Sequence, residues 1–221
     1  TNSITPNGFI PNFTAALGNE SSFDRSQPPV GSLLCKLIYE KYQDKWFLGV
    51  VYDKLLTWNR WWDKARSNNG FLSWGSDPVD NVNDDFSKQA AMFESGLDNS
   101  PLFDEAIFNE KTHLLELASV DLMSIYIADC NALAFIAGEL GKENDKIELQ
   151  ERATKYSLKL NELWDDKSGI YRDKNLIKNE FSIHLSPGNF YPLLAEVPTK
   201  EQADRMINEH FMNPDEFLGN L

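Results

Sequence analysis

Apolar residues recur at helical spacing in five stretches of the chain, and the alternation typical of β-strands is almost absent. The five stretches are residues 30–43, 45–66, 115–140, 145–163 and 199–211. An apolar stripe with a period of 3.6 residues is typical of a helix that packs one face against a core. The pattern therefore predicts an all-α protein built from pairs of antiparallel helices with functional loops at one end.

The five stretches differ in how much of their surface is apolar. The first two carry a single apolar stripe each, formed by Leu33, Leu34, Leu37, Ile38 and Tyr42 and by Phe47, Val51, Leu55, Trp58 and Trp62. The third is apolar on nearly all sides between Val120 and Ala137, which indicates burial on most sides. We expect Gly141 to end this helix and Thr199 to cap the start of the fifth.

Three segments lack any sustained period and are rich in Gly, Pro, Asn, Ser or Asp. They are residues 1–29, 67–112 and 183–194. A loop as long as 67–112 inside a compact domain is either functional or disordered. Its aromatic residues, among them Phe71, Trp74 and Phe93, argue against disorder. We therefore interpret it, including Ala90–Asp104, as a functional loop.

Composition narrows the classes of partner. The chain has 221 residues and a formal net charge of -13, with no cluster of Lys and Arg. Nucleic acid and anionic membranes are therefore not expected as partners. No apolar run approaches the ~18 residues of a membrane span, and no signal peptide is recognised. The compartment stays open, with a slight preference for the cytoplasm.

The sequence contains few residues in patterns that bind a cofactor or a metal ion. Cys35 and Cys130 lie far apart in apolar helical stretches, so we expect both to be buried free thiols. There is no phosphate-binding glycine loop, no Gly-x-Ser-x-Gly elbow and no metal-ligand spacing of histidines. The Asp-rich segment Asp77–Asp85 suits either a structural Ca²⁺ or a solvated acidic loop, and it lacks the EF-hand pattern. We predict no cofactor and no metal.

The segment Ala90–Asp104 sets three acids among large apolar residues. The acids are Glu94, Asp98 and Asp104. Cleavage of a glycosidic bond needs one carboxylic acid that stays protonated near neutral pH and one carboxylate. Apolar surroundings and nearby negative charges both favour the protonated form of an acid. The alternative is a solvated surface turn, and spacing alone does not decide between the two.

Other polar and aromatic residues are candidates for binding. Arg25 and Gln27, in "FDRSQPPV", are good donors to hydroxyl or carboxylate oxygens, although a local ion pair and a helix cap explain them equally well. Trp74 is a candidate for stacking on a sugar ring, whereas Trp58, Trp61 and Trp62 suit the core of a helix. His184 lies in an apolar loop and could line a pocket. His113 and His210 suit the surface or a hydrogen bond.

Two motifs together resemble those of trehalase-like glycoside hydrolases. They are "DRSQPP" at 24–29 and "ESGLDNSPLFD" at 94–104. The likeness is greatest to glycoside hydrolase family 63 and its bacterial relatives that act on mannosylglycerate or glucosylglycerate. Further likeness lies in "NGFIPNF", "LLTWNRWW", "GFLSWGSD", "LWDDKSGIY" and "SPGNFYPLLAEVPTKEQA". Trehalases have Trp where this chain has Leu97 and continue differently after the aspartate, which argues against a trehalase proper.

The resemblance implies a barrel of paired helices, the (α/α)6 fold, and an inverting glycosidase. It places the general acid on Asp98. It also implies that the substrate, a short α-glucoside or α-mannoside, is bound by residues of both motifs and of the aromatic loops. These residues are Arg25, Gln27, Phe71, Trp74, Phe93, Glu94, Asn99, His184 and Tyr191.

The general base that the family uses, a Glu late in the barrel, has no counterpart in these 221 residues. We therefore expect one domain over residues 1–221 that forms the middle of a catalytic barrel, with the rest from a longer parent chain or another copy. A different function stays open, namely a non-catalytic sugar-binding or scaffold protein derived from such an enzyme. A helical-repeat protein is not supported, because the helix pairs show no fixed period.

Overall fold

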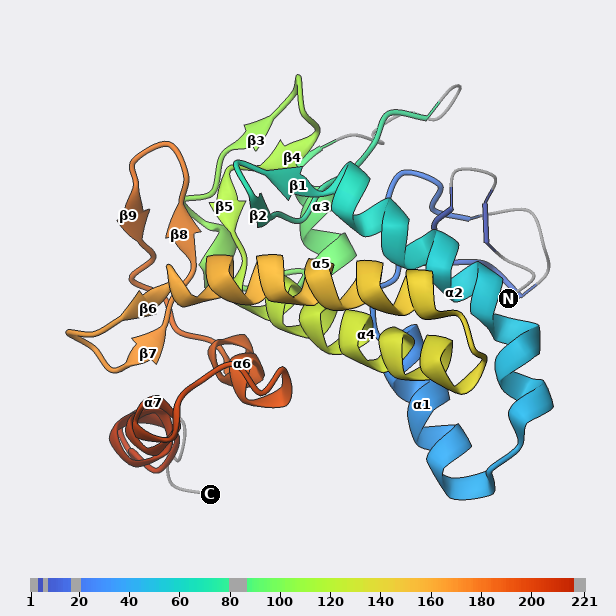
Figure 1. The fold of residues 1–221 in the computed structure, drawn as a ribbon. Helices are drawn as coiled ribbons and strands as arrows, with labels where there is room; N and C mark the ends of the chain where they lie inside the picture. Colours follow the sequence, from blue (N-terminus) through green and yellow to red (C-terminus); the bar gives the residue numbers. More distant parts are fainter. Residues whose placement is uncertain (1–3, 6–7, 17–20, 80–86, 217–221) are drawn as a thin grey trace.

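The computed structural model describes residues 4–5, 8–16, 21–79 and 87–216. Two antiparallel helix pairs form its centre (Figure 1). The first pair is α1 (Gly31–Tyr42) and α2 (Lys45–Ala65), and the second is α4 (Val120–Glu139) and α5 (Glu143–Asn161). These bounds lie within a few residues of the predicted ones, except that α4 begins at Val120 rather than near Leu115. The helix-rich architecture is thus confirmed.

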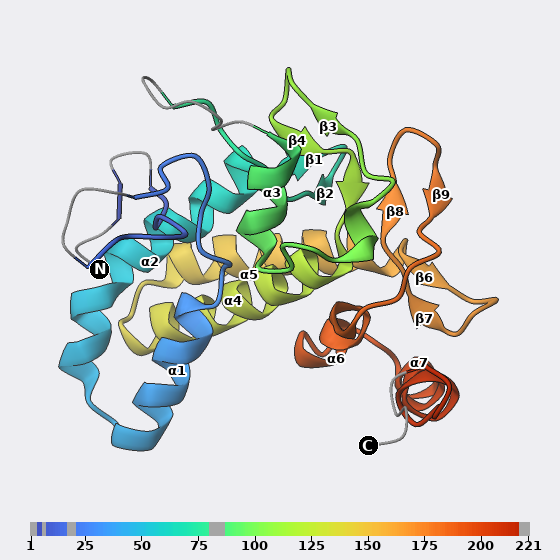
Figure 2. The ribbon, with the colours of Figure 1, turned by 180° about the vertical axis from the view of Figure 1, so that it is seen from behind.

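Helix α4 is the centre of the core. It contacts α1, α2, α5 and α6 (Tyr191–Leu194), and Figures 1 and 2 show it enclosed by them. By length and composition α4 could span a membrane, which corrects the expectation that no apolar run is long enough, but 89% of its most apolar window is buried inside the protein. Its hydropathy is therefore explained by its position in the core, and the described chain itself supplies the neighbours that the sequence pattern requires.

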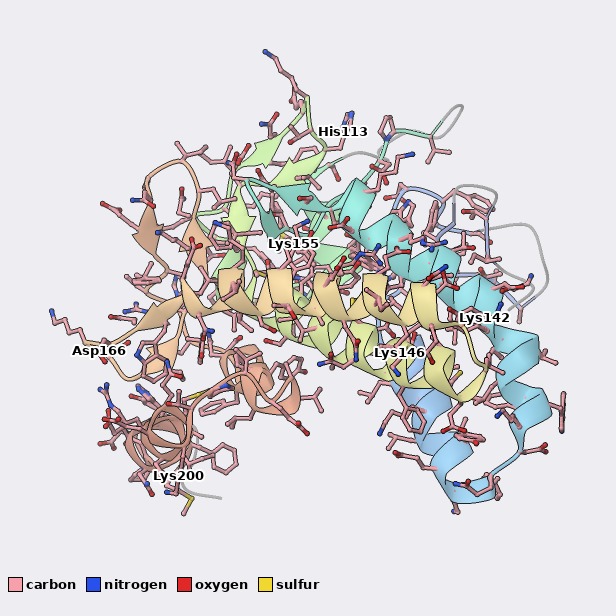
Figure 3. The ribbon with its side chains drawn as sticks, viewed as in Figure 1. His113, Lys142, Lys146, Lys155, Asp166 and Lys200 are labelled. Carbon is pink, nitrogen blue, oxygen red and sulfur yellow. The ribbon has the colours of Figure 1, made fainter. Side chains whose placement is uncertain are left out.

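Charged and hydroxyl groups join α5 to α2 at the edge of this core. Lys155 of α5, labelled in Figure 3, places its Nζ 2.9 Å from Asp63 Oδ1 of α2. The Tyr156 hydroxyl donates to the same oxygen at 2.6 Å. On the same pair of helices, Arg60 donates to Glu148. These contacts fix how the two helix pairs pack against each other.

The loops contain short elements that the sequence pattern did not predict. Within the described residues they are nine two-residue strands, two 3₁₀ turns and the helices α3 (Lys88–Ser95) and α6. The strands are β1 (Ser67–Asn68), β2 (Phe71–Leu72), β3 (Phe108–Asn109), β4 (Leu114–Leu115), β5 (Leu117–Ala118), β6 (Trp164–Asp165), β7 (Ile170–Tyr171), β8 (Lys174–Asn175) and β9 (Glu180–Phe181), and the 3₁₀ turns are η1 (Pro101–Phe103) and η2 (Pro187–Phe190). Two residues are too few for alternation to be visible in a sequence.

The strands pair antiparallel as β1–β2, β3–β4, β6–β7 and β5–β8–β9. They lie together at one end of the helix pairs (Figure 1). Because β4 and β5 occupy Leu114–Ala118, α4 cannot begin before Val120. The small sheets therefore explain the late start of α4.

The start of one helix and the end of another have the capping residues that the sequence predicts. The Thr199 hydroxyl accepts from the Gln202 N–H in a capping box at the start of α7 (Lys200–Arg205), which continues as a π-helical turn, η3 (Met206–Phe211). Gly141 follows α4 with a φ of +70°.

The two cysteines and three of the tryptophans can be compared with their predicted positions. Cys35 is partly buried, Cys130 is buried, and both are free thiols. Trp58, Trp61 and Trp62 belong to the core, as predicted.

One apolar surface is not covered within the described residues. The stripe of α1 faces solvent and continues onto the start of α2. Its members, each 45–67% exposed, are Leu34, Leu37, Ile38, Tyr42, Trp46 and Val50. A stripe at helical spacing indicates a packed face. The α1 residues of this surface are therefore exposed where the sequence pattern predicts burial, whereas Trp46 and Val50 lie outside the stripe predicted for α2.

Candidate functional site

The segment that carries Asp98 begins as a helix, which corrects its interpretation as a loop throughout. In α3 the Ser87 hydroxyl accepts from the Ala90 N–H at 3.1 Å and caps the first turn. Gly96, with a φ of +72°, ends the helix, since glycine adopts this conformation without strain. Asp98 follows two residues later, at the start of a turn. The eight residues of α3 are too short and too polar to show a helical period.

Glu94, on the last turn of α3, is wholly buried and fully engaged. Its Oε1 accepts from the Ser26 N–H at 2.8 Å and its Oε2 from the Gly75 N–H at 2.8 Å. Arg66 donates from Nε to Oε2 at 2.7 Å and from Nη2 to Oε1 at 2.8 Å. Glu94 therefore joins both sequence motifs and the loop of Gly75, and its position is that of a residue that shapes the site.

Arg66 is the buried partner of this carboxylate and also donates to Asp77 at 3.0 Å and 3.1 Å. Burial by itself lowers the pKa of a guanidinium, but the charges and hydrogen bonds of Glu94 and Asp77 outweigh it and raise the pKa of Arg66 above its usual range. Burial also raises the pKa of Glu94, although Arg66 and the N–H groups of Ser26 and Gly75 oppose the shift. A buried pair of this kind is stable only because each partner is hydrogen-bonded.

An open cavity of about 540 Å³ lies where the two motifs meet. Four predicted site residues line it, namely Arg25, Gln27, Phe93 and Asp98. The Arg25 guanidinium lies 5.3 Å from the centroid of the Phe93 ring and pairs with Asp24 at 2.7 Å. Gln27 donates to the Asn12 carbonyl. The arrangement brings a cation, an amide, an aromatic ring and a carboxyl group to one surface.

Asp98 itself is exposed at this cavity. The sequence left two alternatives open, a carboxyl group kept partly dry by Phe93, Leu97, Leu102 and Phe103 or a solvated turn. Leu102 and Phe103 instead point into the core, with 3% and 0% of their surface exposed, because the turn η1 directs them away from Asp98. The described chain has the solvated turn, in which Asp98 faces solvent.

A second, smaller cavity of about 180 Å³ adjoins the first at Pro28. Trp74 and Tyr191, both predicted site residues, line it together with Asp121. Trp74 Nε1 donates to Asp121 Oδ1 at 3.3 Å. Loop residues 95–98 border both cavities, since Ser95 and Leu97 line one and Gly96 and Asp98 the other. The two cavities therefore lie next to each other around a single loop.

Asp121 and Asp173 form a pair of buried carboxyl groups at the N-terminus of α4. Asp173 Oδ1 accepts from the Val120 N–H at 2.8 Å, and Asp121 Oδ1 accepts from the Leu122 N–H at 2.6 Å. Burial raises the pKa of Asp121 to about 6. Burial, together with the charge of Asp121, raises the pKa of Asp173 to about 7. The pair holds its protons more tightly than exposed aspartates do.

The remaining predicted site residues lie apart from these two cavities. Phe71 belongs to β2, is 6% exposed and has Lys159 Nζ 5.0 Å from its ring centroid. Asn99 is exposed in the turn after Asp98. His184 is partly exposed and its N–H donates to the Ser182 hydroxyl at 3.2 Å. None of the three lines either cavity.

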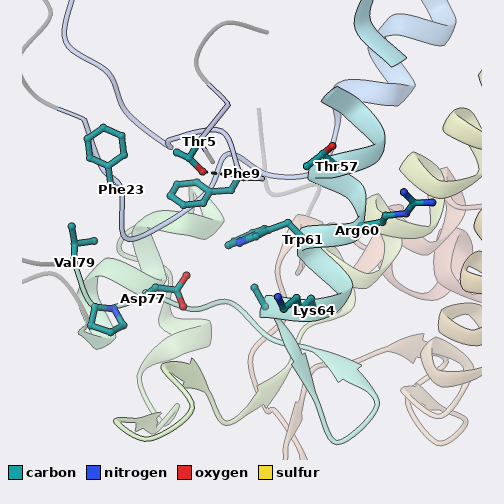
Figure 4. A pocket seen from close by; sticks show the side chains of 11 residues that line it. Thr5, Phe9, Phe23, Thr57, Arg60, Trp61, Lys64, Asp77 and Val79 are labelled. Atoms are coloured by element: carbon teal, nitrogen blue, oxygen red, sulfur yellow. Dashed lines mark hydrogen bonds between the residues drawn. The ribbon is translucent and has the colours of Figure 1, made fainter. Parts of the chain in front are cut away.

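A third and larger cavity, of about 810 Å³, lies over α2 on a different surface (Figure 4). Trp61, Arg60, Lys64 and Asp77 line it, and no predicted site residue does. Its aromatic floor offers little free ring surface, because Phe9 packs on Trp61 with ring centroids 5.2 Å apart and Arg66 lies 4.6 Å from the same ring. Size alone therefore does not identify the candidate site.

Within the part of the chain that the structure describes, no group of three or more His, Cys, Asp or Glu side chains could hold a metal ion. Most of the segment considered for Ca²⁺ lies outside the described residues, at 80–86. Asp77, which is described, pairs with Arg66 instead.

Sequence reasoning missed Arg66, Asp121 and Asp173. Arg66 follows a long helix and gave no distinctive signal. Asp121 did give one, since it stands in the first turn of a helix that is otherwise apolar nearly all round. A charged residue in such a helix is buried and needs partners.

Comparisons with known proteins bear on this site. The family model described as "Mannosylglycerate hydrolase MGH1-like glycoside hydrolase domain" matches residues 1–221. Mannosylglycerate hydrolase MGH1 of Selaginella moellendorffii is 23% identical over 230 aligned positions, which cover 80% of this chain and 44% of that protein.

Solved structures share the fold. The GH63 mannosylglycerate hydrolase of Thermus thermophilus, in complex with glucose, aligns with a TM-score of 0.72 at 21% identity and covers 94% of this chain and 60% of its own. Neutral trehalase Nth1 of Saccharomyces cerevisiae aligns with a TM-score of 0.59 at 17% identity, over 84% of this chain and 43% of its own. These comparisons confirm the resemblance drawn from the two motifs. The chain spans less than half the length of the plant relative and about 60% of the bacterial one.

Proposed function

This chain belongs to the mannosylglycerate hydrolase MGH1-like glycoside hydrolase domain family, and we propose that it contributes the general acid, Asp98, to an inverting hydrolase of short α-glucosides or α-mannosides. One observation carries the proposal. Asp98 faces an open cavity of about 540 Å³ whose other walls include Arg25, Gln27 and Phe93, so a glycosidic oxygen can approach its carboxyl group.

The proposed reaction is a single displacement. Asp98 gives its proton to the glycosidic oxygen as the bond from that oxygen to the anomeric carbon breaks. Water attacks the same carbon from the opposite face of the ring and gives its proton to a second carboxylate, about 6.5–9.5 Å from the first. The seven residues that line the cavity include no carboxylate other than Asp98, and we propose that the base comes from the rest of the whole protein.

The neighbouring residues suit binding of the glycoside. Arg25 and Gln27 offer donors to hydroxyl groups or to a carboxylate on the aglycone. Phe93 and Tyr191 offer ring surface to the apolar face of a sugar, and Trp74 forms part of the wall. Glu94 does not line the cavity and holds the neighbouring loops in place by accepting from the Ser26 and Gly75 N–H groups. We keep Phe71, Asn99 and His184 as proposed contacts at the periphery.

We further propose that residues 1–221 are one domain and supply the middle of an (α/α)6 barrel, completed by the rest of the whole protein or by another copy. Two observations support this. The chain covers 60% of the T. thermophilus chain with which it aligns. The stripe of α1 that includes Leu34, Leu37 and Tyr42 is half-exposed or more, and burial of such a surface is favourable by roughly 25 cal/mol per Å².

The test is hydrolysis by the whole protein of a panel of α-glucosides and α-mannosides, with glucosylglycerate and mannosylglycerate included. The anomer released is followed by NMR. We expect turnover with inversion of configuration, reduced by about 10²–10⁴-fold in Asp98→Asn and retained in Asp104→Asn, an exposed acid six residues away. Retention of configuration, or an unaffected Asp98→Asn variant, would exclude the proposed mechanism.

A second candidate, a sugar-binding protein without catalysis, is favoured by the same exposed Asp98. No apolar wall desolvates that carboxyl group within the described residues. In this case the whole protein binds the glycosides without turnover, and Asp98→Asn binds them as well as the parent does. The panel above separates the two candidates directly.

A further inference from the structure

The carboxyl group of Asp121 lies in the wall of the smaller cavity and uses only one of its two oxygens. Oδ1 accepts from the Leu122 N–H and from Trp74 Nε1. Oδ2 accepts from no other residue that the structure describes, and the backbone N–H of Asp121 itself is the remaining donor beside the carboxyl group. The side chain is nevertheless almost wholly buried, with 6% of the residue exposed.

A buried carboxylate oxygen without a donor is costly, by about 1–3 kcal/mol or more for a charged group. Because Leu122 and Trp74 engage Oδ1, Oδ2 is the oxygen of Asp121 that is available to the cavity that this residue lines. The rest of that lining is largely apolar, with Trp74, Leu97 and Ile125 among its members. Asp121 is the one carboxyl group in this lining, whose other polar side-chain groups include the hydroxyls of Ser95 and Tyr191.

Pyranose rings match this lining. Their hydroxyl groups are donors for an acceptor-only carboxylate, and their C–H faces suit aromatic and aliphatic carbon. The volume of about 180 Å³ is several times the ~30 Å³ that a single water occupies in the liquid. The cavity adjoins Asp98 through the loop 95–98, so a sugar ring placed here has its glycosidic oxygen on the side of the proposed acid.

We propose that Asp121 is a sugar-binding residue whose Oδ2 accepts a hydrogen bond from one hydroxyl group of the pyranose ring that is cleaved. The inference rests on the proposed function and adds a contact in the second cavity. Trp74 holds the carboxyl group in place through Oδ1, and Asp173 fixes the backbone beside it through the Val120 N–H.

Asp129 provides a matched control on the same helix. It is also buried, at 1% exposure, but both of its oxygens are engaged. Oδ1 accepts from the Ser32 N–H at 2.8 Å and Oδ2 from Asn59 Nδ2 at 2.9 Å. Asp129→Asn therefore removes a buried charge from α4 without removing a group that faces the cavity.

The experiment measures binding and turnover separately in the whole protein. The binding probes are methyl α-D-mannopyranoside, methyl α-D-glucopyranoside and their monodeoxy analogues, with Kd from ligand-observed NMR. We expect Asp121→Asn to weaken binding of the better parent glycoside by about tenfold to a hundredfold, the value of a hydrogen bond to a charged group. For the one deoxy analogue that lacks the contacted hydroxyl, the variant and the parent protein should bind equally. Asp129→Asn should leave every Kd within about twofold.

A second substitution at the same position tests whether a loss of binding by Asp121→Asn is caused by misfolding. Asp121→Ser keeps an acceptor near the Leu122 N–H but withdraws Oδ2, and it should weaken binding as Asp121→Asn does. Equal effects of the Asp121 and Asp129 substitutions, or a loss with Asp121→Asn that persists on every deoxy analogue, would overturn the inference. So would absence of any binding of these glycosides to the parent protein.

The outcomes separate this inference from the proposed function. Hydrolysis with inversion that is insensitive to Asp121 keeps the function and rejects the binding role. Binding that depends on Asp121 without any hydrolysis keeps the binding role and rejects the function. In an active protein, we expect Asp121→Asn to raise KM for the parent glycoside and to leave KM for the informative deoxy glycoside unchanged.

Discussion

The guanidinium of Arg66 donates two hydrogen bonds, of 2.7 Å and 2.8 Å, to the carboxylate of Glu94, and both side chains are wholly buried. The pair joins the C-terminal end of α2 to the last turn of α3. Through the Ser26 N–H, Glu94 also holds the loop that carries Arg25 and Gln27. The position of the candidate site therefore depends on one ion pair between residues 28 positions apart.

Replacement of Glu94 by Gln should destabilise the fold by about 3–5 kcal/mol, because it leaves the buried Arg66 charge without its main partner. Asp77 compensates only in part, since its side chain is 36% exposed. The measurement is the free energy of unfolding in urea. Asp204→Asn, which breaks the exposed pair of Lys200 and Asp204, should change that free energy by less than about 1 kcal/mol. Equal effects at both positions would show that the buried pair has no special role.

Gly75→Ala should destabilise the fold and disturb the same pair. A Cβ at this position would lie 2.6 Å from the His113 carbonyl oxygen and 3.0 Å from Arg66 Nε. Overpacking of this kind costs about 1–3 kcal/mol. Gly49→Ala is the matched control, since its Cβ would meet no atom within 4 Å and it lies inside α2. Gly49→Ala should stabilise the fold by about 0.5–1 kcal/mol. Thermal unfolding should therefore show a lower unfolding temperature for Gly75→Ala and a higher one for Gly49→Ala than for the parent protein.

The helices could be predicted closely because their apolar period is a local property. Residues 30–43 and 45–66 were expected to be helical, and the helices occupy Gly31–Tyr42 and Lys45–Ala65. Helix α3 could not be predicted, because eight residues with mixed polarity give no period. The exposure of the α1 stripe could not be predicted either, since a pattern identifies an apolar face and not the surface that covers it.

The candidate site was only partly accessible from the sequence. Resemblance of two motifs to a family placed Arg25, Gln27, Phe93 and Asp98 together, and one cavity contains all four. The burial of Glu94 with Arg66 depends on how α2 approaches α3, which no local pattern encodes. The second cavity could not be predicted either, because no local pattern shows which distant residues pack together. Its lining includes Pro28, Trp74, Asp121 and Tyr191, which lie far apart in the chain.

Asp129→Asn should flatten the dependence of stability on pH. Burial raises the pKa of Asp129 to about 6, although hydrogen bonds from Asn59 and Ser32 oppose the shift. The folded protein thus binds this proton more tightly than the unfolded chain does. The stabilisation by the proton is complete below about pH 4, the ordinary range for Asp, and is lost as the pH rises through about 6.

An asparagine cannot titrate, so the free energy of unfolding of the variant relative to the parent should rise by about 2 kcal/mol between pH 4 and pH 7, since each pKa unit is worth about 1.36 kcal/mol. Urea unfolding of both proteins at each pH gives this difference, in which the contributions of Asp121 and Asp173 cancel. Parallel curves over this range would contradict the assignment of a buried, titrating carboxyl group.

Asp98→Asn should lose activity only where the leaving group needs a proton. General acid catalysis contributes about 10²–10⁴-fold, so turnover of mannosylglycerate or glucosylglycerate by the whole protein should fall by that factor. Because 2,4-dinitrophenolate leaves without protonation, hydrolysis of 2,4-dinitrophenyl α-glycosides should fall far less, and kcat for the two substrate types measures the contrast. Asp98 is exposed, and its replacement should change the free energy of unfolding by no more than about 0.5 kcal/mol. An equal loss on both substrate types in a stable variant would mean that Asp98 acts on water or on binding, because only a proton donor to the leaving group distinguishes the two substrates.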